Sequence, residues 1–98
     1  MDEKKREAFI RKQDAALEKM DAKIARLEAR TQEAKAENKQ KIQETLDKLK
    51  AQREETRQKL DELKNSGAEA WSSLQQGVQT AVKDLKSGLK NAKKDLSK

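Results

Sequence analysis

The chain has 98 residues, of which 24 are Lys or Arg and 18 are Asp or Glu, so its net charge is +6 and charged side chains make up 43%. It contains neither Cys nor His, which excludes disulfides and thiol chemistry and removes the commonest general base and metal ligand. Only 33% of the residues are hydrophobic, so neither a membrane span nor a core large enough for a lone globule is expected.

The composition favours long helices. Ala, Glu, Lys, Leu and Arg account for 58 of the 98 residues, which is typical of coiled coils. Leu, Ile, Val and Phe account for only 16, a share that by itself is typical of disorder. The absence of Pro and the presence of only three Gly remove the usual helix breakers. The composition alone is compatible with long helices and with disorder. A helical period in the apolar residues would favour the helices and thus an all-α fold.

The N-terminal part has such a period. Ile10, Leu17 and Ile24 recur every seven residues, and Met20 and Leu27 follow at the companion positions. From Thr31 to Lys41 the heptad positions hold no large apolar residue, and the apolar series then resumes one residue out of phase. The resumed seam consists of Ile42, Leu46, Leu49, Leu60 and Leu63.

The phase slip through Ala34, Asn38 and Ile42 contains neither Gly nor Pro. We therefore predict one continuous helix over residues 3–64 rather than a turn at the slip. Residues 1–64 form the first expected unit, a heptad coiled-coil helix. Its apolar seam is one-sided and would need a cover.

A joint is expected at Asn65-Ser66-Gly67. Asn and Gly are common where helices end, and Ser66 with Glu69 matches a capping box that would start the next helix. Two structures are compatible with this segment: a hairpin in which the chain reverses, and one helix that continues through a soft joint. Both alternatives stay open, and both make residues 65–67 a hinge.

Residues 68–98 form the second expected unit, an amphipathic helix with an 11-residue repeat. Trp71 and Val82 are eleven apart, as are Val78 and Leu89. The predicted stripe meets either a partner helix or an anionic membrane surface. Asp84 and Asp95 at its edge favour the protein partner. The stripe consists of Trp71, Leu74, Val78, Val82, Leu85 and Leu89.

Other functions find little support. The excess of basic residues is +3 in residues 1–64 and again in 66–98, which gives no concentrated basic stripe along the sequence. The only two aromatic residues, Phe9 and Trp71, offer no stacking platform, so specific nucleic-acid binding is not expected. Carboxylates such as Glu54 and Glu55 would lie solvated on a helix. We assign no catalytic, cofactor or metal residues.

The Arg6–Ile10 stretch, R-E-A-F-I, and the later Ala70, Trp71, Leu74 and Gly77 resemble small bacterial coiled-coil domain-containing proteins of unassigned function. The resemblance covers nearly the whole length and implies a charged helical fold without known ligand residues. The 11-residue repeat also resembles those of desiccation-protective proteins and exchangeable apolipoproteins.

Together these features predict a non-enzymatic cytoplasmic scaffold or adaptor that self-associates and binds a partner by helix packing. We expect a homo-oligomer, with a dimer preferred. The alternative is a membrane-surface or stress-protective amphipathic protein. The expected oligomer interface consists of Ile10, Leu17, Met20, Ile24, Leu27, Ile42, Leu46, Leu49, Leu60 and Leu63.

Overall fold

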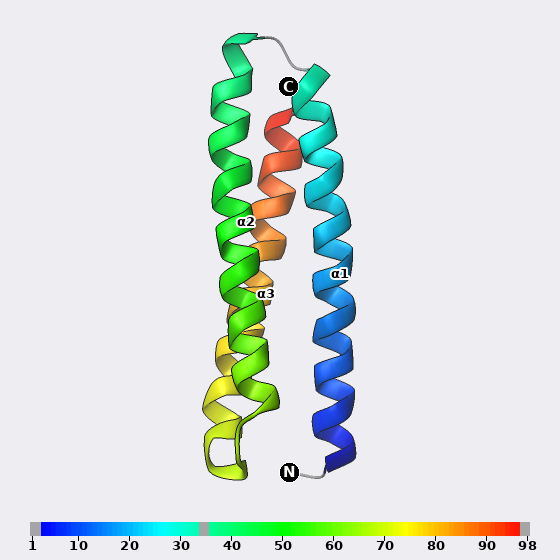
Figure 1. Cartoon of the computed structure of the whole chain (residues 1–98), viewed down its shortest axis with the longest axis vertical. Helices are drawn as coiled ribbons and strands as arrows, with labels where there is room; N and C mark the ends of the chain where they lie inside the picture. Colours follow the sequence, from blue (N-terminus) through cyan, green and yellow to red (C-terminus); the bar gives the residue numbers. More distant parts are fainter. Residues whose placement is uncertain (1–2, 34–35, 97–98) are drawn as a thin grey trace.

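The protein is an all-α rod, as predicted. The computed structural model describes residues 3–33 and 36–96, which form three helices: α1 (Glu3–Glu33), α2 (Ala36–Lys64) and α3 (Ala68–Leu96). The rod measures 51 × 17 × 17 Å. α2 runs antiparallel to α1, and α3 runs parallel to α1 and packs against both (Figure 1).

The prediction of one helix over residues 3–64 is wrong. α1 ends at Glu33, α2 begins at Ala36, and the chain direction reverses between them. Ala34, part of the phase slip, lies outside the described residues. The reversal has a physical reason in the sequence, because no bulky apolar residue lies between Leu27 and Ile42. A straight helix would leave both seams uncovered, and folding back buries one against the other, so packing overrides local helix propensity.

The core joins both predicted apolar stripes within a single chain. The seams of α1 and α2 face inward, and the 11-residue stripe of α3 closes the bundle over them. One bundle thus gathers nearly every large apolar side chain, although the composition predicted a core too small for a lone globule. The buried hydrophobic residues are Leu17, Met20, Ile24, Leu27, Leu46, Leu49, Leu60, Leu63, Trp71, Val78, Val82, Leu85, Leu89 and Ala92.

The 65–67 segment is a helical hairpin turn and not a soft joint in one helix. α2 ends at Lys64 and α3 begins at Ala68. The Ser66 hydroxyl donates to the Leu63 carbonyl at 2.8 Å, and the Asn65 amide group donates to the Asp61 carbonyl at 3.0 Å. Both side chains thus add a second hydrogen bond to carbonyls at the end of α2 that already accept from the backbone N–H groups of Asn65 and Ser66. The predicted capping box, in which Ser66 caps the start of α3, is wrong. The Ser66 side chain instead caps the C-terminal end of α2.

Small residues on one side of α3 let it lie close to α2. A Cβ built on Gly88 would come within 2.9 Å of Leu49 Cδ2 and 3.4 Å of Gln52 Oε1. The same construction on Gly77 meets nothing within 4 Å. α2 and α3 form the most extensive helix contact, and α1 and α3 the least extensive. The side of α3 that carries Gly88 therefore faces α2, and the opposite side, with Trp71, faces α1.

Candidate functional site

The residues singled out from the sequence do not form an exposed site. Eight of the ten expected interface residues are buried inside the single chain, and Ile10 and Ile42 are partly buried against the same core. The predicted partner or membrane stripe on α3 is likewise internal: Leu74 is partly buried and its other five residues are buried. Since α3 covers the seams of α1 and α2, neither seam requires a second copy of the chain to cover it. A functional surface must be sought among the exposed residues.

The exposed charges of α1 are sorted by flank. Four acidic residues recur every seven positions on the flank that faces α2: Glu7, Asp14, Asp21 and Glu28. Three of them pair with cations of α2. Arg53 Nη1 lies 3.3 Å from Asp21 Oδ1, Lys64 Nζ lies 3.3 Å from Asp14 Oδ1, and Lys50 pairs with Glu28. These side chains are 35–42% exposed, so each pair contributes only about 0.2–1 kcal/mol.

The opposite flank of α1, which faces α3, is basic. Phe9 on this flank contacts Trp71 of α3, with ring centroids 6.0 Å apart, which fixes the direction in which the flank points. Lys23 and Arg30 follow Phe9 at multiples of seven, and Lys12 and Lys19 belong to the adjacent row. All four of these cations are exposed.

α3 contributes a second basic row beside the first. Its lysines lie on the side of the helix that turns away from Gly88 and α2, and thus towards α1 and solvent. Together the two rows form what we call the basic face, and all ten of its residues are exposed. The basic face consists of Lys5, Lys12, Lys19, Lys23, Arg26 and Arg30 of α1 and Lys83, Lys86, Lys90 and Lys93 of α3.

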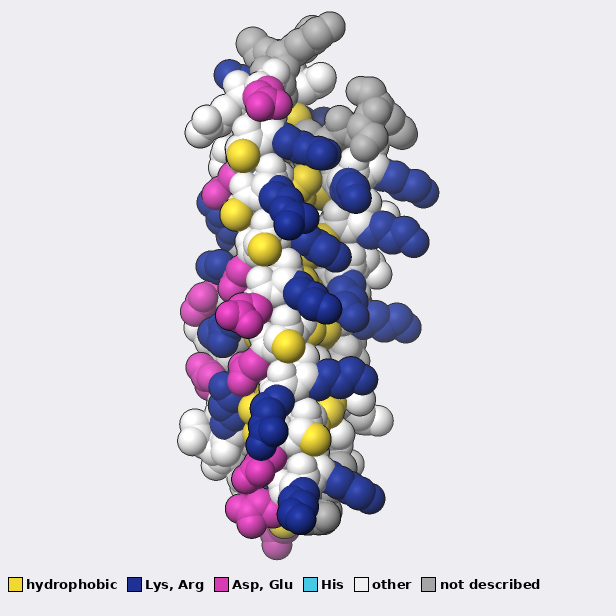
Figure 2. All heavy atoms as spheres, turned by 90° about the vertical axis from the view of Figure 1, so that its right-hand side faces the viewer, with side chains coloured by type: hydrophobic (Ala, Val, Ile, Leu, Met, Phe, Trp, Pro, Cys, Tyr) yellow, Lys and Arg dark blue, Asp and Glu magenta, His cyan; other side chains and the backbone are white. Residues whose placement is uncertain are grey.

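The charge segregation is visible on the surface of the bundle. In Figure 2 the Lys and Arg side chains cover the right-hand part, over α1 and the α3 side, whereas most Asp and Glu side chains lie on the left of α1. The face holds ten of the chain's 24 basic residues, so the remainder carries 18 acidic against 14 basic residues. A net charge of only +6 therefore conceals a strongly positive side and a slightly negative remainder.

One end of the bundle closes around Trp71. The Arg6 guanidinium lies 4.3 Å from the centroid of the Trp71 ring and donates to the Ser66 carbonyl at 2.8 Å. Phe9 meets the same ring edge-on at 75°. Trp71 is 3% exposed, and its Nε1 is buried without a hydrogen-bond partner in the described part of the structure. Both aromatic rings of the chain thus serve the fold, since Phe9 on the basic flank of α1 packs against Trp71.

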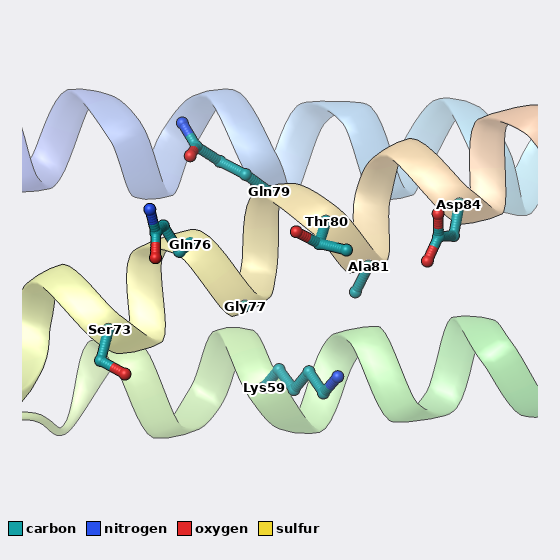
Figure 3. Close-up of a pocket in the computed structure, with 8 residues that line it drawn as sticks. All are labelled: Lys59, Ser73, Gln76, Gly77, Gln79, Thr80, Ala81 and Asp84. Carbon is teal, nitrogen blue, oxygen red and sulfur yellow. The ribbon is translucent and has the colours of Figure 1, made fainter.

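A shallow hollow lies between α2 and α3. Gly77 and Ala81 leave space there, and Lys59 and Asp84 stand on its two sides (Figure 3). The other lining residues are Ser73, Gln76, Gln79 and Thr80, which are uncharged. The hollow is open to solvent and offers neither a desolvated carboxylate nor a nucleophile beside a base, which are the usual requirements of a catalytic site. The basic face is the stronger candidate for function.

Within the described residues, no helix is both long and apolar enough to cross a bilayer. In comparisons with known proteins, no family model matches the chain, and no curated protein or solved structure matches it either. The resemblance to small bacterial coiled-coil proteins thus stays a prediction. The properties of the surface itself must support any functional proposal.

Sequence reasoning missed the basic face because it counted charges along the chain. A signal was nevertheless present in the seven-residue rows of α1. Glu7, Asp14 and Asp21 occupy one row, whereas Lys12 and Lys19 occupy a row on the opposite side. Sorting charges by helix flank would have revealed a basic stripe on α1. Its continuation on α3 could not be foreseen, because the sequence left the hairpin undecided.

Proposed function

We propose that this chain is a non-catalytic binding protein that attaches to a polyanionic partner through the basic face. The observation that carries the proposal is the alignment of ten exposed cations along α1 and α3, with the acidic row of α1 turned away towards α2. A cationic surface of this kind raises the local concentration of anions and accelerates their association. The proposal includes the cytoplasmic location expected from the sequence.

This proposal replaces helix packing as the mode of binding. A scaffold that binds a partner helix needs an apolar stripe on its surface, and the stripes that suggested one are used inside the bundle. Leu17 and Leu85, for example, are 0% exposed. Self-association stays a proposal, and the large apolar residues that suggested it lie in the core or pack against it. The ten cations of the basic face, in contrast, are exposed in the folded chain.

The test compares two variants of equal charge on a heparin matrix. The face variant replaces Lys23, Lys86 and Lys90 by Gln, and the control variant replaces the exposed Lys39, Lys41 and Lys48 of α2 by Gln. Each lowers the net charge by three and introduces a good helix former. We expect the wild-type chain and the control to elute at similar salt concentrations. The face variant should elute at clearly lower salt.

The proposal fails if the wild-type chain is not retained at about 0.15 M salt, where surface charges are already screened beyond about 8 Å. It also fails if both variants elute together, since retention would then follow net charge and not the basic face. Circular dichroism of all three proteins checks that the helices are intact.

A further inference from the structure

Resting on the polyanion binding proposed above, we propose that the partner is an anionic lipid bilayer, on which the folded bundle lies flat with α1 and α3 against the headgroups. Nucleic acid is the main competing polyanion. The shape of the face, the type of its cations and the small apolar residues beside them distinguish the two partners.

The shape of the face fits a plane. α1 and α3 run side by side in the same direction along a rod 51 Å long, so their cations form two roughly parallel rows. The bundle is 17 Å across. The major groove of duplex DNA is about 12 Å wide, so the two rows cannot enter it together. On a curved duplex only part of the face would reach phosphates, whereas a bilayer can meet both rows at once.

The cations suit diffuse attraction better than recognition of bases. Eight of the ten are Lys, a compact point charge on a flexible stem, and only Arg26 and Arg30 carry the planar group that reads base edges. Single-stranded nucleic acid is commonly held by aromatic stacking. Phe9 and Trp71, the only aromatic residues, are held against each other at the Arg6 end of the bundle.

Small apolar residues border the basic row of α1. Ala8, Ala15, Ala22 and Ala29 recur every seven residues and are all exposed. Figure 2 shows hydrophobic side chains along α1 beside the Lys and Arg side chains. Methyl groups next to long lysines let a helix settle into the boundary between headgroups and acyl chains while the ammonium groups extend to phosphate. A hydrated phosphodiester backbone offers no such apolar environment.

Binding in this mode leaves the core closed. The ammonium groups are already at the surface, and Trp71 is 3% exposed in the free bundle. The membrane mode expected from the sequence, in which the Trp71 stripe enters the lipid, would instead require the bundle to open. Flat docking therefore predicts attachment with neither a gain of helix nor a change in the surroundings of Trp71.

The experiment measures cosedimentation of the full chain with vesicles of phosphatidylserine and phosphatidylcholine at about 3:7, with pure phosphatidylcholine vesicles as the neutral control. Each cation near an anionic bilayer strengthens binding about fivefold. The Lys23, Lys86 and Lys90 to Gln variant should thus partition about 100-fold more weakly, and the Lys39, Lys41 and Lys48 to Gln variant should lose about fivefold at most. A parallel titration uses duplex DNA at the same concentration of anionic groups and the same salt.

Tighter binding to the DNA than to the anionic vesicles would overturn the lipid assignment and leave polyanion binding intact. Binding to neither probe would overturn the polyanion proposal itself. Equal binding to neutral and anionic vesicles would also overturn the inference, because charge would not be the cause. A shift of Trp71 emission or a change in helicity on the anionic vesicles would overturn the flat mode. Salt-sensitive binding to anionic vesicles, with unchanged Trp71 emission, is the expected result.

Discussion

Arg6 and Trp71 lie 65 positions apart in the sequence, yet the guanidinium of Arg6 stacks over the indole at 4.3 Å and also donates to the backbone of the α2–α3 turn. This one side chain therefore ties the start of α1 to both the turn and α3. It does so at the helix contact that is least extensive in the bundle, between α1 and α3. The contact should have a measurable effect on stability.

Replacing Arg6 by Ala should lower the free energy of unfolding by about 1–3 kcal/mol, since it removes a charged hydrogen bond and a cation–π contact. Arg6→Lys should restore part of the loss, because it keeps the cation without the planar group. Arg11→Ala is the control, because the side chain of Arg11 is 81% exposed and pairs with Glu7 of the same helix at 3.7 Å. Urea denaturation followed by Trp71 emission measures all three. Equal effects of Arg6→Ala and Arg11→Ala would contradict the role assigned to Arg6.

Like charges face each other along the α1–α3 edge, so removing one should stabilise the bundle. Lys23→Glu places an acid beside the lysine row of α3 and should raise the free energy of unfolding by about 0.2–1 kcal/mol at low salt. Lys23→Gln removes the repulsion without adding an attraction and should give a smaller gain. Both gains should shrink as salt rises, because exposed charges are screened. Thermal melts at low and high salt would refute this if Lys23→Glu were neutral at both.

The two interior glycines of α3 should respond to Ala in opposite directions. Gly77 has free space around a new Cβ, so Gly77→Ala should gain about 0.5–1 kcal/mol of helix propensity. At Gly88 the new Cβ would meet Leu49 Cδ2 at 2.9 Å, and Leu49 is itself buried at 3% exposure. Overpacking typically costs about 1–3 kcal/mol, so at Gly88 the cost should exceed the gain in helix propensity, and Gly88→Ala should lower the stability. Thermal unfolding temperatures that rise for both variants would show that α2 and α3 can separate more easily than the structure indicates.

Because the core lies within one chain, the double variant Leu17→Lys and Ile24→Lys should unfold without a change in molar mass. Two buried ammonium groups cannot be accommodated, so helicity should collapse. The control variant, Ala15→Lys with Ala22→Lys, lies on the exposed side of α1 and should stay helical. Sedimentation with circular dichroism decides, with 11.2 kDa expected throughout. A heavier parent whose core variant becomes a helical monomer would place this seam between copies.

How far the sequence could predict the fold is clearest from individual residues. The seven-residue spacing of Leu17 and Ile24 and the eleven-residue spacing of Trp71 and Val82 correctly predicted which sides of the helices avoid water. Periodicity identifies the face to be buried but not what covers it. The partner of the Leu17 seam was therefore expected in another molecule, although it lies in α2 and α3 of the same chain.

The reversal of the chain between α1 and α2 could not be predicted for a different reason. The stretch from Thr31 to Lys41 contains no Gly or Pro, and its residues favour helix, so local propensity predicted continuity. The reversal is a consequence of tertiary packing, which local patterns do not record. The second turn was easier because Asn65, Ser66 and Gly67 are common turn residues, although the role of Ser66 was assigned to the wrong helix.

The acidic row on α1 also has a topological consequence. A three-helix bundle of this length can be assembled in two ways, with the third helix packed on either side of the first two. In the alternative arrangement the flank of α1 that carries Lys23 would lie against α2, and Asp14 and Asp21 would lie against α3. The cations at Arg53 and Arg57 would then meet lysines instead of their present acids. Ion pairs that are individually weak can thus select the handedness of the bundle, because the alternative arrangement would lose all the ion pairs between α1 and α2 at once and replace attraction by repulsion.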